Sequence, residues 1–315
     1  MDGAGEIDRT AGRRLVALVC VAQVLVQIGA FFWPALLPQL APQWGLSNSG
    51  AGWITAAFYG AYMLAVPVLV PLTDRYDPKR IYLLGVGLTI VGHAMFGLVV
   101  DGFWSALLCR ALTGIGWAGT YMTGLKLLAD RVDAKMMSRA TAGHAASIGI
   151  SGAMSFATAE WITQLGGWQS AFVAAALSAV LAWLIIATVV PAQQRKPTRA
   201  ADGGGLYDFR PVLKNRSAMA YALAYCIHTL EMSALRGWGV AFLAYVAATT
   251  GGQGAAISPA VLVTALGLIG TFASLLGNEA AIRLGRRRLV QTARSALLEP
   301  TRTPSPRFSC SSTVW

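Results

Sequence analysis

The chain has 315 residues, of which 55% are hydrophobic and only 12% are charged. A soluble domain usually carries about 25% charged residues, so this composition excludes a fold whose whole surface faces water and indicates a membrane protein. The net charge of +11 does not indicate a nucleic-acid partner, because the basic residues fall between apolar runs rather than along one soluble face.

Apolar runs follow one another along the chain, each long enough to cross a membrane as a helix of about 20 residues. They contain Gly and Ala throughout, which lets membrane helices approach closely, and they lack the alternation of strands. The first run is too long for a signal peptide and lacks a clear cleavage site. We therefore predict an all-α, polytopic membrane helix bundle. The eight expected spans cover residues 14–36, 51–71, 80–100, 103–127, 138–164, 168–190, 217–247 and 258–282.

Lysine and arginine occur at the amino terminus and in every second connection between the expected spans. The connections without them read "LPQLAPQWGLSNSG", "DG", "QLGG" and "ATTGGQGAAIS". Because basic residues concentrate on the cytoplasmic side of membrane proteins, this alternation predicts that residues 1–13 are cytoplasmic. We expect an integral protein of the bacterial inner (plasma) membrane.

The long connection at residues 191–216 is rich in Pro, Gly and charge, so we expect a cytoplasmic linker. It separates a six-span bundle, residues 14–190, from a two-span partial bundle, residues 217–288. Residues 289–315 are polar and rich in Pro and Ser, which is typical of a disordered tail that cannot cross a membrane. The sequence thus predicts a six-helix half followed by an incomplete second half.

The first and fifth spans contain polar side chains. Placing such side chains inside a membrane costs free energy, so they usually face a cavity or a partner. Gln23 and Gln27 are four residues apart and so share one face of the first helix. They either line a pathway or bond across to other helices. Glu160, near the outer end of the fifth span, is a candidate gating residue.

The turn "PLTDRYDPKR" at residues 71–80 places five charged residues on the predicted cytoplasmic side of a chain that is poor in charge. Asp74 and Arg75 do not form a metal-binding or catalytic pattern. The charges either fix the topology and stay solvated, or they hold neighbouring spans together.

The fourth span carries Arg110, Gly114, Trp117 and Tyr121 at helical spacing, so we expect them on one face. An arginine beside aromatic rings suits a carboxylate, a phosphate or a ring-bearing ligand. The other interpretation is an arginine that donates to carbonyl groups of neighbouring helices or to another span. On the first interpretation this face belongs to the pathway of a substrate or a proton.

The seventh span carries His228, Glu231 and Arg236 near its middle. Glu231 is the best candidate for a proton-carrying group, because burial raises the pKa of a carboxyl towards neutrality. A structural Glu231–Arg236 pair is the competing interpretation, and it requires the helix to bend, which Gly237 and Gly239 permit. A metal site is not expected, because no second histidine or carboxylate pair matches the pair His228 and Glu231.

Three motifs, placed correctly relative to the spans, resemble the major facilitator superfamily of secondary transporters. "LTDRYDPKR" at 72–80 is similar to the family's G-x-L-x-D-R-x-G-R-R turn, with Asp77-Pro78 in place of a glycine. "RALTGIGWAG" at 110–119 resembles its R-x-x-x-G pattern, and "GNEAAIRLGRRR" at 277–288 resembles a second, altered copy of the turn.

The resemblance implies alternating access, with spans one, four and seven lining a central cavity and the charged turns acting as latches. Asp74 is then expected near a helix amino terminus or near Arg139 of the next cytoplasmic loop, where a charge-assisted contact contributes about 1–3 kcal/mol. The gating residues that it implies are Asp74, Arg75, Lys79, Arg80, Arg139, Gly277, Arg283, Gly285 and Arg286.

The resemblance also implies twelve spans, whereas the apolar pattern stops after eight. We expect a frameshift or a premature end of the reading frame, with a genuine eight-span variant as the other interpretation. A half-built second bundle would leave cavity-facing surface without its partners.

The leading functional prediction is a secondary active transporter of a small solute in the lipid bilayer. Arg110 and Arg236 favour an anionic or zwitterionic solute, and a proton is the candidate coupling ion. No P-loop pattern indicates ATP, and no cofactor is expected. The competing predictions are an inactive truncated transporter or a membrane assembly partner, and, less favoured, a polytopic membrane enzyme, for which no catalytic constellation is found.

Overall fold

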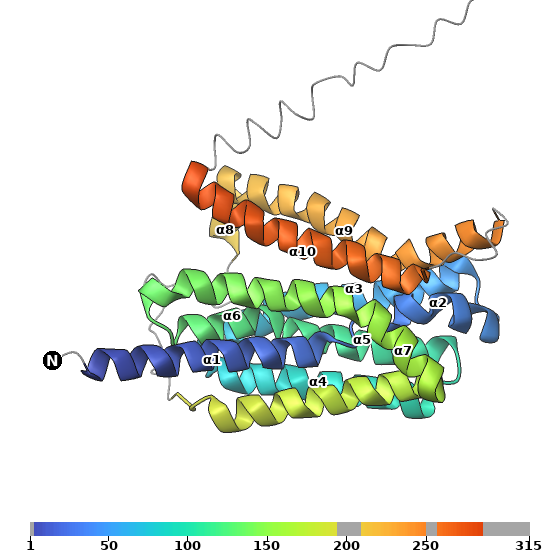
Figure 1. The fold of residues 1–315 in the computed structure, drawn as a ribbon, viewed down its shortest axis with the longest axis horizontal. Coiled ribbons are helices and arrows are strands. Elements are labelled where there is room, and N and C mark those ends of the chain that lie inside the picture. The colour runs from blue at the N-terminus through green and yellow to red at the C-terminus, as the bar shows by residue number, and fades with distance from the viewer. Residues whose placement is uncertain (1–2, 194–208, 250–256, 286–315) are drawn as a thin grey trace, which may run out of the picture. The chain divides into compact units, whose positions relative to one another are not determined.

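The computed structural model of the chain describes residues 3–193, 209–249 and 257–285. Ten α-helices and no strand occur in these residues, which confirms the predicted all-α class (Figure 1). The helices are α1 (Gly3–Gln27), α2 (Phe32–Gln43), α3 (Asn48–Leu72), α4 (Pro78–Val99), α5 (Phe103–Ala118), α6 (Tyr121–Ala129), α7 (Ala134–Val189), α8 (Arg210–Lys214), α9 (Arg216–Thr249) and α10 (Pro259–Leu284). The chain divides into two compact units, Met1–Thr271 and Phe272–Trp315.

The predicted spans are helical over most of their described residues. By length and composition alone, five described segments could cross a membrane. They are Ala11–Gln43, Asn48–Leu72, Pro78–Val99, Met136–Val189 and Pro259–Gly277. Met136–Val189 has 54 residues, enough for two crossings of about 20 residues each. It therefore holds the fifth and sixth predicted spans.

The first predicted span is divided between two helices. Residues 28–31 separate α1 from α2, and α2 continues into residues that the sequence assigns to a connection. Burial accounts for this extension, because Phe32, Trp33 and Leu40 of α2 are completely buried. Tertiary packing thus keeps a helix despite two internal prolines.

Glycines mark the other breaks. The fourth span divides at Gly119 and Thr120, where a Cβ on Gly119 would lie 2.7 Å from the Cα of Gly85 on α4. Within α7, Gly166 and Gly167 leave helical geometry, and Gly167 has a φ of +81° that a side chain would strain. At the break within α7 the chain reverses direction and runs back along the bundle.

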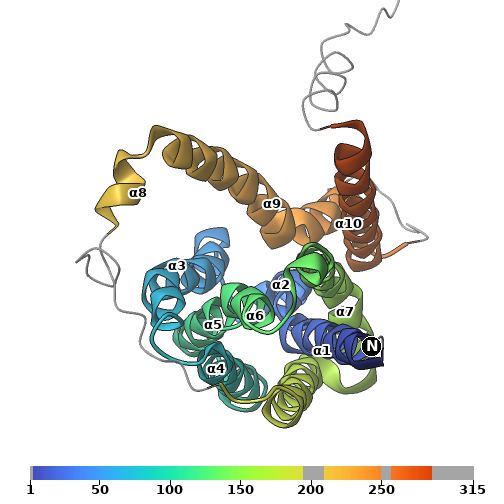
Figure 2. The ribbon, with the colours of Figure 1, turned by 90° about the vertical axis from the view of Figure 1, so that its left-hand side faces the viewer.

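The unit Met1–Thr271 is built from closely packed helices. Its most extensive helix contacts join α1 to α7, α3 to α5, and α4 to both α5 and α7. Figure 2, which looks along these helices, shows α4 and α5 side by side. A Cβ on Gly114 of α5 would collide with the carbonyl oxygen of Phe58 on α3. Small residues therefore set the helix spacing, as expected in a membrane bundle.

Two groups of buried side chains form the core of this unit. One is aromatic and includes Trp33, Phe96 and Phe172, with the Phe96 and Phe172 rings stacked at a centroid distance of 4.0 Å. The other is mostly aliphatic and includes Val19 and Leu127. Both fix the relative positions of α1, α4 and α7, which carry or support the polar residues described next.

The described part of the second unit is the last portion of α10. Arg283 Nε lies 2.8 Å from Glu279 Oε1, one helical turn away, and both side chains are exposed. Gly285 follows the helix with a φ of +85°, the left-handed conformation common after helix carboxyl termini.

Candidate functional site

Arg110 of α5 lies inside the helix bundle with only 2% of its surface exposed. Its Nη1 donates to the Ala30 carbonyl at 3.1 Å, and its guanidinium carbon lies 4.1 Å from the centroid of the Phe58 ring. Its Nε is buried and finds no hydrogen-bond partner among the described residues. In the same part of the chain no carboxylate forms an ion pair with it. The carbonyl bond expected by one interpretation therefore exists, but it leaves the charge without a counter-ion.

Trp117 continues this face of α5 into a group of aromatic rings. Its ring lies 4.9 Å from Phe58, 5.7 Å from Tyr62 and 6.0 Å from Phe31, measured between centroids. The indole N–H is buried and has no partner among the residues that the structure describes. The helical spacing thus correctly brings Trp117 close to the ring that lies under Arg110.

Tyr121 lies beyond the break between α5 and α6. Its ring stacks on His144 of α7 at a centroid distance of 6.3 Å, and His144 Nε2 lies 3.0 Å from the Tyr121 carbonyl oxygen. Its hydroxyl interacts with Tyr225 of α9. The break therefore leaves Tyr121 within reach of the first part of α9.

Arg236 of α9 is half-buried and approaches the same aromatic group from another helix. Its guanidinium carbon lies 5.3 Å from the centroid of Phe31, the ring that contacts Trp117 edge-on. Tyr59 of α3 lies close enough to Arg110 and Arg236 to interact electrostatically with both charges. Two guanidinium groups from separate helices thus share one aromatic environment.

His228 and Glu231 are exposed on α9, which runs without a break past Arg236. No ion pair joins Glu231 to Arg236, both of which the structure describes. Arg236 lies against the Phe31 ring instead. The proton-carrying role of Glu231 stays a prediction.

Gln23 and Gln27 of α1 are both buried. Gln23 Oε1 accepts from the Tyr82 hydroxyl at 2.9 Å, so this residue does bond across to another helix. The Nε2 atoms of both glutamines have no partner in the described part of the chain. The sequence allows two interpretations of these glutamines, a pathway lining or a bond between helices. Gln23 makes the bond between helices.

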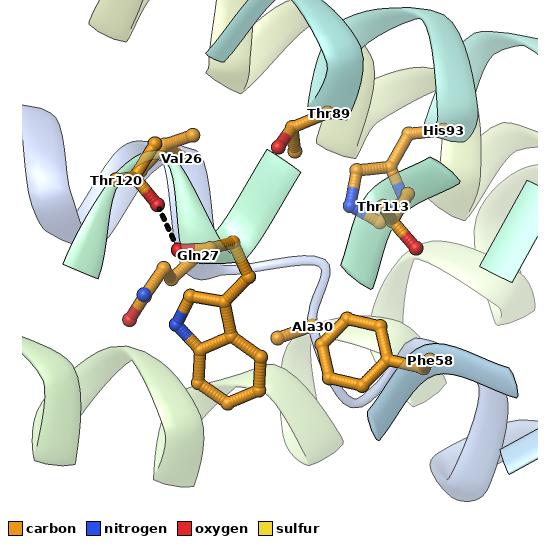
Figure 3. Close-up of a pocket in the computed structure, with 9 residues that line it drawn as sticks. Val26, Gln27, Ala30, Phe58, Thr89, His93, Thr113 and Thr120 are labelled. Carbon is orange, nitrogen blue, oxygen red and sulfur yellow. Dashed lines mark hydrogen bonds between the residues drawn. The ribbon is translucent and has the colours of Figure 1, made fainter. Parts of the chain in front are cut away.

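A small cavity of about 10 Å³, room for about one water molecule, lies beside Gln27 (Figure 3). Ala30 and Phe58, the two contacts of Arg110, also line it, together with threonines from α4 and α5. The cavity therefore reaches the surroundings of the Arg110 guanidinium. Its lining residues are Val26, Gln27, Ala30, Phe58, Thr89, His93, Thr113, Trp117 and Thr120.

At the predicted cytoplasmic end, Asp77 joins three segments of the chain. Its Oδ1 accepts from Lys79 N at 3.0 Å, which caps α4, and from Arg131 Nη2 at 2.7 Å. Its Oδ2 accepts from Gln193 N at 2.8 Å, just beyond α7. The side chains of Asp77 and Arg131 are 4% and 3% exposed. Although burial by itself raises the pKa of Asp77, these three donors and the Arg131 charge lower it below its usual value.

Lys79 strengthens the same network. Its Nζ donates to the carbonyl oxygens of Ala187 at 2.8 Å and Val190 at 2.5 Å, at the carboxyl terminus of α7, where a cation is favoured. We expected Lys79 to be a gating residue, and it lies beside the beginning of the predicted linker.

Asp74 approaches Lys126, with Oδ1 and Nζ 3.9 Å apart, and both side chains are partly exposed. The expected approach to Arg139 is not among its described ion pairs. Arg75, Arg80 and Arg139 are exposed. Their gating roles stay predictions.

The second expected latch is only partly described. Gly277, Arg283 and Gly285 lie at the end of α10 and just beyond it, and Arg283 pairs with Glu279. Arg286 lies outside the described residues.

Two features of this site were missed in the sequence. Phe31, which touches both Trp117 and Arg236, lies between α1 and α2, and no periodicity marks it. The Asp77–Arg131 pair joins residues 54 positions apart. Asp-Pro at the start of a helix is a capping signal that could have singled out Asp77, although not its partner.

A sequence model of the family described as Major Facilitator Superfamily matches residues 19–298 of this chain. Protein spinster homolog 1 of Homo sapiens is 25% identical over 244 residues, which are 73% of this chain and 45% of that protein. The sphingosine-1-phosphate transporter SPNS2 of Xenopus tropicalis is 22% identical, over 70% of this chain and 44% of that protein. The uncharacterized MFS-type transporter YbcL of Bacillus subtilis (strain 168) is 23% identical, over 70% and 59% respectively.

A crystal structure of a bacterial homolog of the human lysosomal transporter Spinster, in an inward-facing and unoccupied conformation, has the same fold. It aligns with a TM-score of 0.65 and 16% sequence identity, over 88% of this chain and 64% of that chain. The chain spans about half the length of the spinster relatives that it matches.

Proposed function

Because this chain belongs to the Major Facilitator Superfamily, a family of multi-pass membrane transporters, we propose that it moves a small anionic or zwitterionic solute across the membrane by alternating access. The proposed location is the bacterial inner membrane, with the amino terminus in the cytoplasm, as the distribution of basic residues favours.

The observation that carries this proposal is the pair of arginines around one aromatic group. Arg110 is buried and Arg236 is half-buried, and neither has an ion-pair partner among the described carboxylates. An unpaired charge away from water is costly, so a bound anion that pairs with it would be strongly favoured. Guanidinium groups bind carboxylates and phosphates through two parallel hydrogen bonds.

One relative is named for a charged solute. The Xenopus tropicalis protein is named a sphingosine-1-phosphate transporter, and its solute carries a phosphate group. The aromatic rings of Phe31, Phe58 and Trp117 would contact the less polar part of such a solute, next to the guanidinium groups.

Proton coupling is the finer part of the proposal. Glu231 lies on the same helix as Arg236, five residues before it, and a carboxyl that titrates during the cycle would couple solute movement to a proton. Glu231→Gln would then remove the dependence of uptake on a pH gradient while leaving exchange of solute against solute. Unchanged pH dependence would contradict this role.

A thermal-shift screen tests binding at the arginines. The purified chain is heated with sphingosine-1-phosphate, succinate, alanine or glucose, and the melting temperature is recorded. We expect a stabilising shift with at least one charged solute and none with glucose. In Arg110→Ala the apparent affinity should fall about tenfold or more, the loss expected for one charged hydrogen bond. Arg110→Lys should be intermediate, because lysine keeps the charge but not the planar fork.

The matched control is Arg216→Ala, which removes an exposed arginine from the beginning of α9 and should leave the shift unchanged. A shift with glucose alone, or a charged-solute shift that Arg110→Ala leaves intact, would contradict the proposal.

A further inference from the structure

The first arm of α7 and the beginning of α10 meet along a seam of small side chains. A Cβ on Gly267 of α10 would lie 2.8 Å from the Cβ of Ala153 on α7. A Cβ on Gly149 would lie 3.2 Å from the Cβ of Thr271. These distances leave no room for a larger residue, so the two helices are in close contact here.

Hydrogen bonds cross the same seam. Ala157 N donates to Thr264 Oγ1 at 3.0 Å, and Ser258 Oγ donates to Glu160 Oε2 at 2.5 Å. Glu160 and Ser258 are 98 residues apart in the chain and both are partly buried. The seam thus ends in a charge-assisted hydrogen bond, which is stronger than a bond between neutral groups.

Ser258 also determines where α10 begins. Its Oγ accepts from Val261 N at 3.2 Å, which is the geometry of a helix cap. The Glu160 carboxylate therefore lies at the amino terminus of a 26-residue helix, where the helix dipole favours a negative charge. One hydroxyl both caps α10 and ties it to α7.

The position of this contact in the predicted topology gives it a role. Glu160 lies near the end of the predicted fifth span that faces away from the cytoplasm, and Ser258 begins the eighth span from the same side. The network around Asp77 lies at the predicted cytoplasmic ends of other helices. The fifth span belongs to the six-span bundle and the eighth to the second half, so the contact joins the two parts that move against each other in alternating access.

We propose that Glu160 and Ser258 are positioning residues that hold the non-cytoplasmic side of the transporter closed by joining α7 to α10. The inference rests on the proposed function for the transport cycle, but the contact itself can be tested without a solute. Breaking it shifts the equilibrium towards the state that is open to the outside. The expected change in the ratio of open to closed molecules is about tenfold or more, the value of one hydrogen bond to a charged group.

Spin labels at two exposed positions report on this equilibrium. Leu165 on α7 and Val261 on α10 are 72% and 45% exposed, so labels on cysteines placed there disturb little. The native cysteines are replaced in this background, and pulsed electron–electron distance measurements are made in liposomes. We expect a short distance to dominate in the parent chain, and a longer one to gain population in Glu160→Ala.

Ser258→Gly tests the hydrogen bond to Glu160 separately from the cap of α10. Glycine at a helix cap costs only a few tenths of a kcal/mol relative to serine, but it removes the hydroxyl that reaches Glu160. We expect Ser258→Gly to match Glu160→Ala, and the double variant to shift no further than either single one, because all three lose the same bond.

Ser258→Thr keeps the hydroxyl and should retain most of the short-distance population, whereas Glu160→Gln keeps an acceptor without the charge and should be intermediate. Glu279→Ala, which removes an exposed carboxylate from the same helix, should have no effect. Unchanged distances in Glu160→Ala and Ser258→Gly, or shifts that add in the double variant, would overturn the inference. If the distances shift as predicted but the chain binds no charged solute, the closing role of the Glu160–Ser258 contact stands and the proposed function is contradicted.

Discussion

Asp77 illustrates, at the scale of a single residue, how one carboxylate can connect three segments of a helix bundle. It caps α4, pairs with Arg131 after α6 and accepts from the backbone beyond α7. Both members of the ion pair are almost fully buried, so removing one leaves the other unpaired in a poor environment for charge. The residue therefore contributes to stability, whether or not the turn also acts as a latch.

Asp77→Asn should lower the free energy of unfolding at pH 7 by about 3–5 kcal/mol, the usual cost of breaking a buried pair. The lowered pKa of Asp77 sets the pH range of this effect. Stability from a carboxyl whose pKa is lowered by folding is fully present above the unfolded value of about 3.9 and is lost as the pH falls through the folded value. As the pH falls below about 4, the difference between the parent chain and the variant should thus begin to shrink.

The measurement is unfolding in mixed micelles, repeated from pH 7 down to pH 3. Asp133→Asn is the control, because Asp133 is exposed and its side chain makes no capping bond to α7. Equal stability of the parent and Asp77→Asn at pH 7 would show that the buried pair adds nothing.

At the scale of helices, the contact between α3 and α5 positions the arginine site. Gly114 lies one turn after Arg110 and touches the backbone of Phe58, whose ring lies under the guanidinium. A larger residue at Gly114 would push these helices apart and move the ring away. Packing and binding are coupled at this point.

Gly114→Ala should therefore destabilise the chain by about 1–3 kcal/mol, the range for overpacking a tight contact. Gly60→Ala in α3 is the matched control, since a Cβ there meets nothing within 4 Å and alanine favours helix. Thermal unfolding of both variants tests this. A Gly114→Ala variant as stable as Gly60→Ala would mean that the helices can separate at no cost.

The positions of the long helices were largely predictable from hydropathy, but the helix breaks were not. Apolar length locates α3 and α4 because lipid demands it. The break at Gly119 lies where Gly85 of another helix approaches closely, and the extension of α2 contains the buried Trp33. Such contacts between distant segments leave no local pattern.

The candidate site was predictable to a similar degree. Helical spacing predicted that Arg110 and Trp117 share one face of a helix, and both lie against the Phe58 ring. Phe31, which connects that ring group to Arg236, lies between helices, where no periodicity operates. The expected Glu231–Arg236 pair is not among the described ion pairs, and Arg236 lies against Phe31 instead.

At the scale of the whole molecule, the cations inside the apolar bundle and the contacts at its two ends would take part in one transport cycle. Arg110 and Arg236 would receive the solute, the Glu160–Ser258 contact would close the outer side, and Asp74 with its neighbours would act on the cytoplasmic side. The assignment of inside and outside rests on the distribution of lysine and arginine between the spans.

Solute uptake into proteoliposomes tests the central claim, that an anion or zwitterion crosses through the arginine site. Uptake of labelled sphingosine-1-phosphate, succinate, alanine and glucose is compared for the parent chain, Arg110→Ala and Arg216→Ala. We expect uptake of at least one charged solute above that of protein-free liposomes, reduced about tenfold or more by Arg110→Ala and unaffected by Arg216→Ala. Uptake of no charged solute, or equal uptake by the parent and Arg110→Ala, would contradict it.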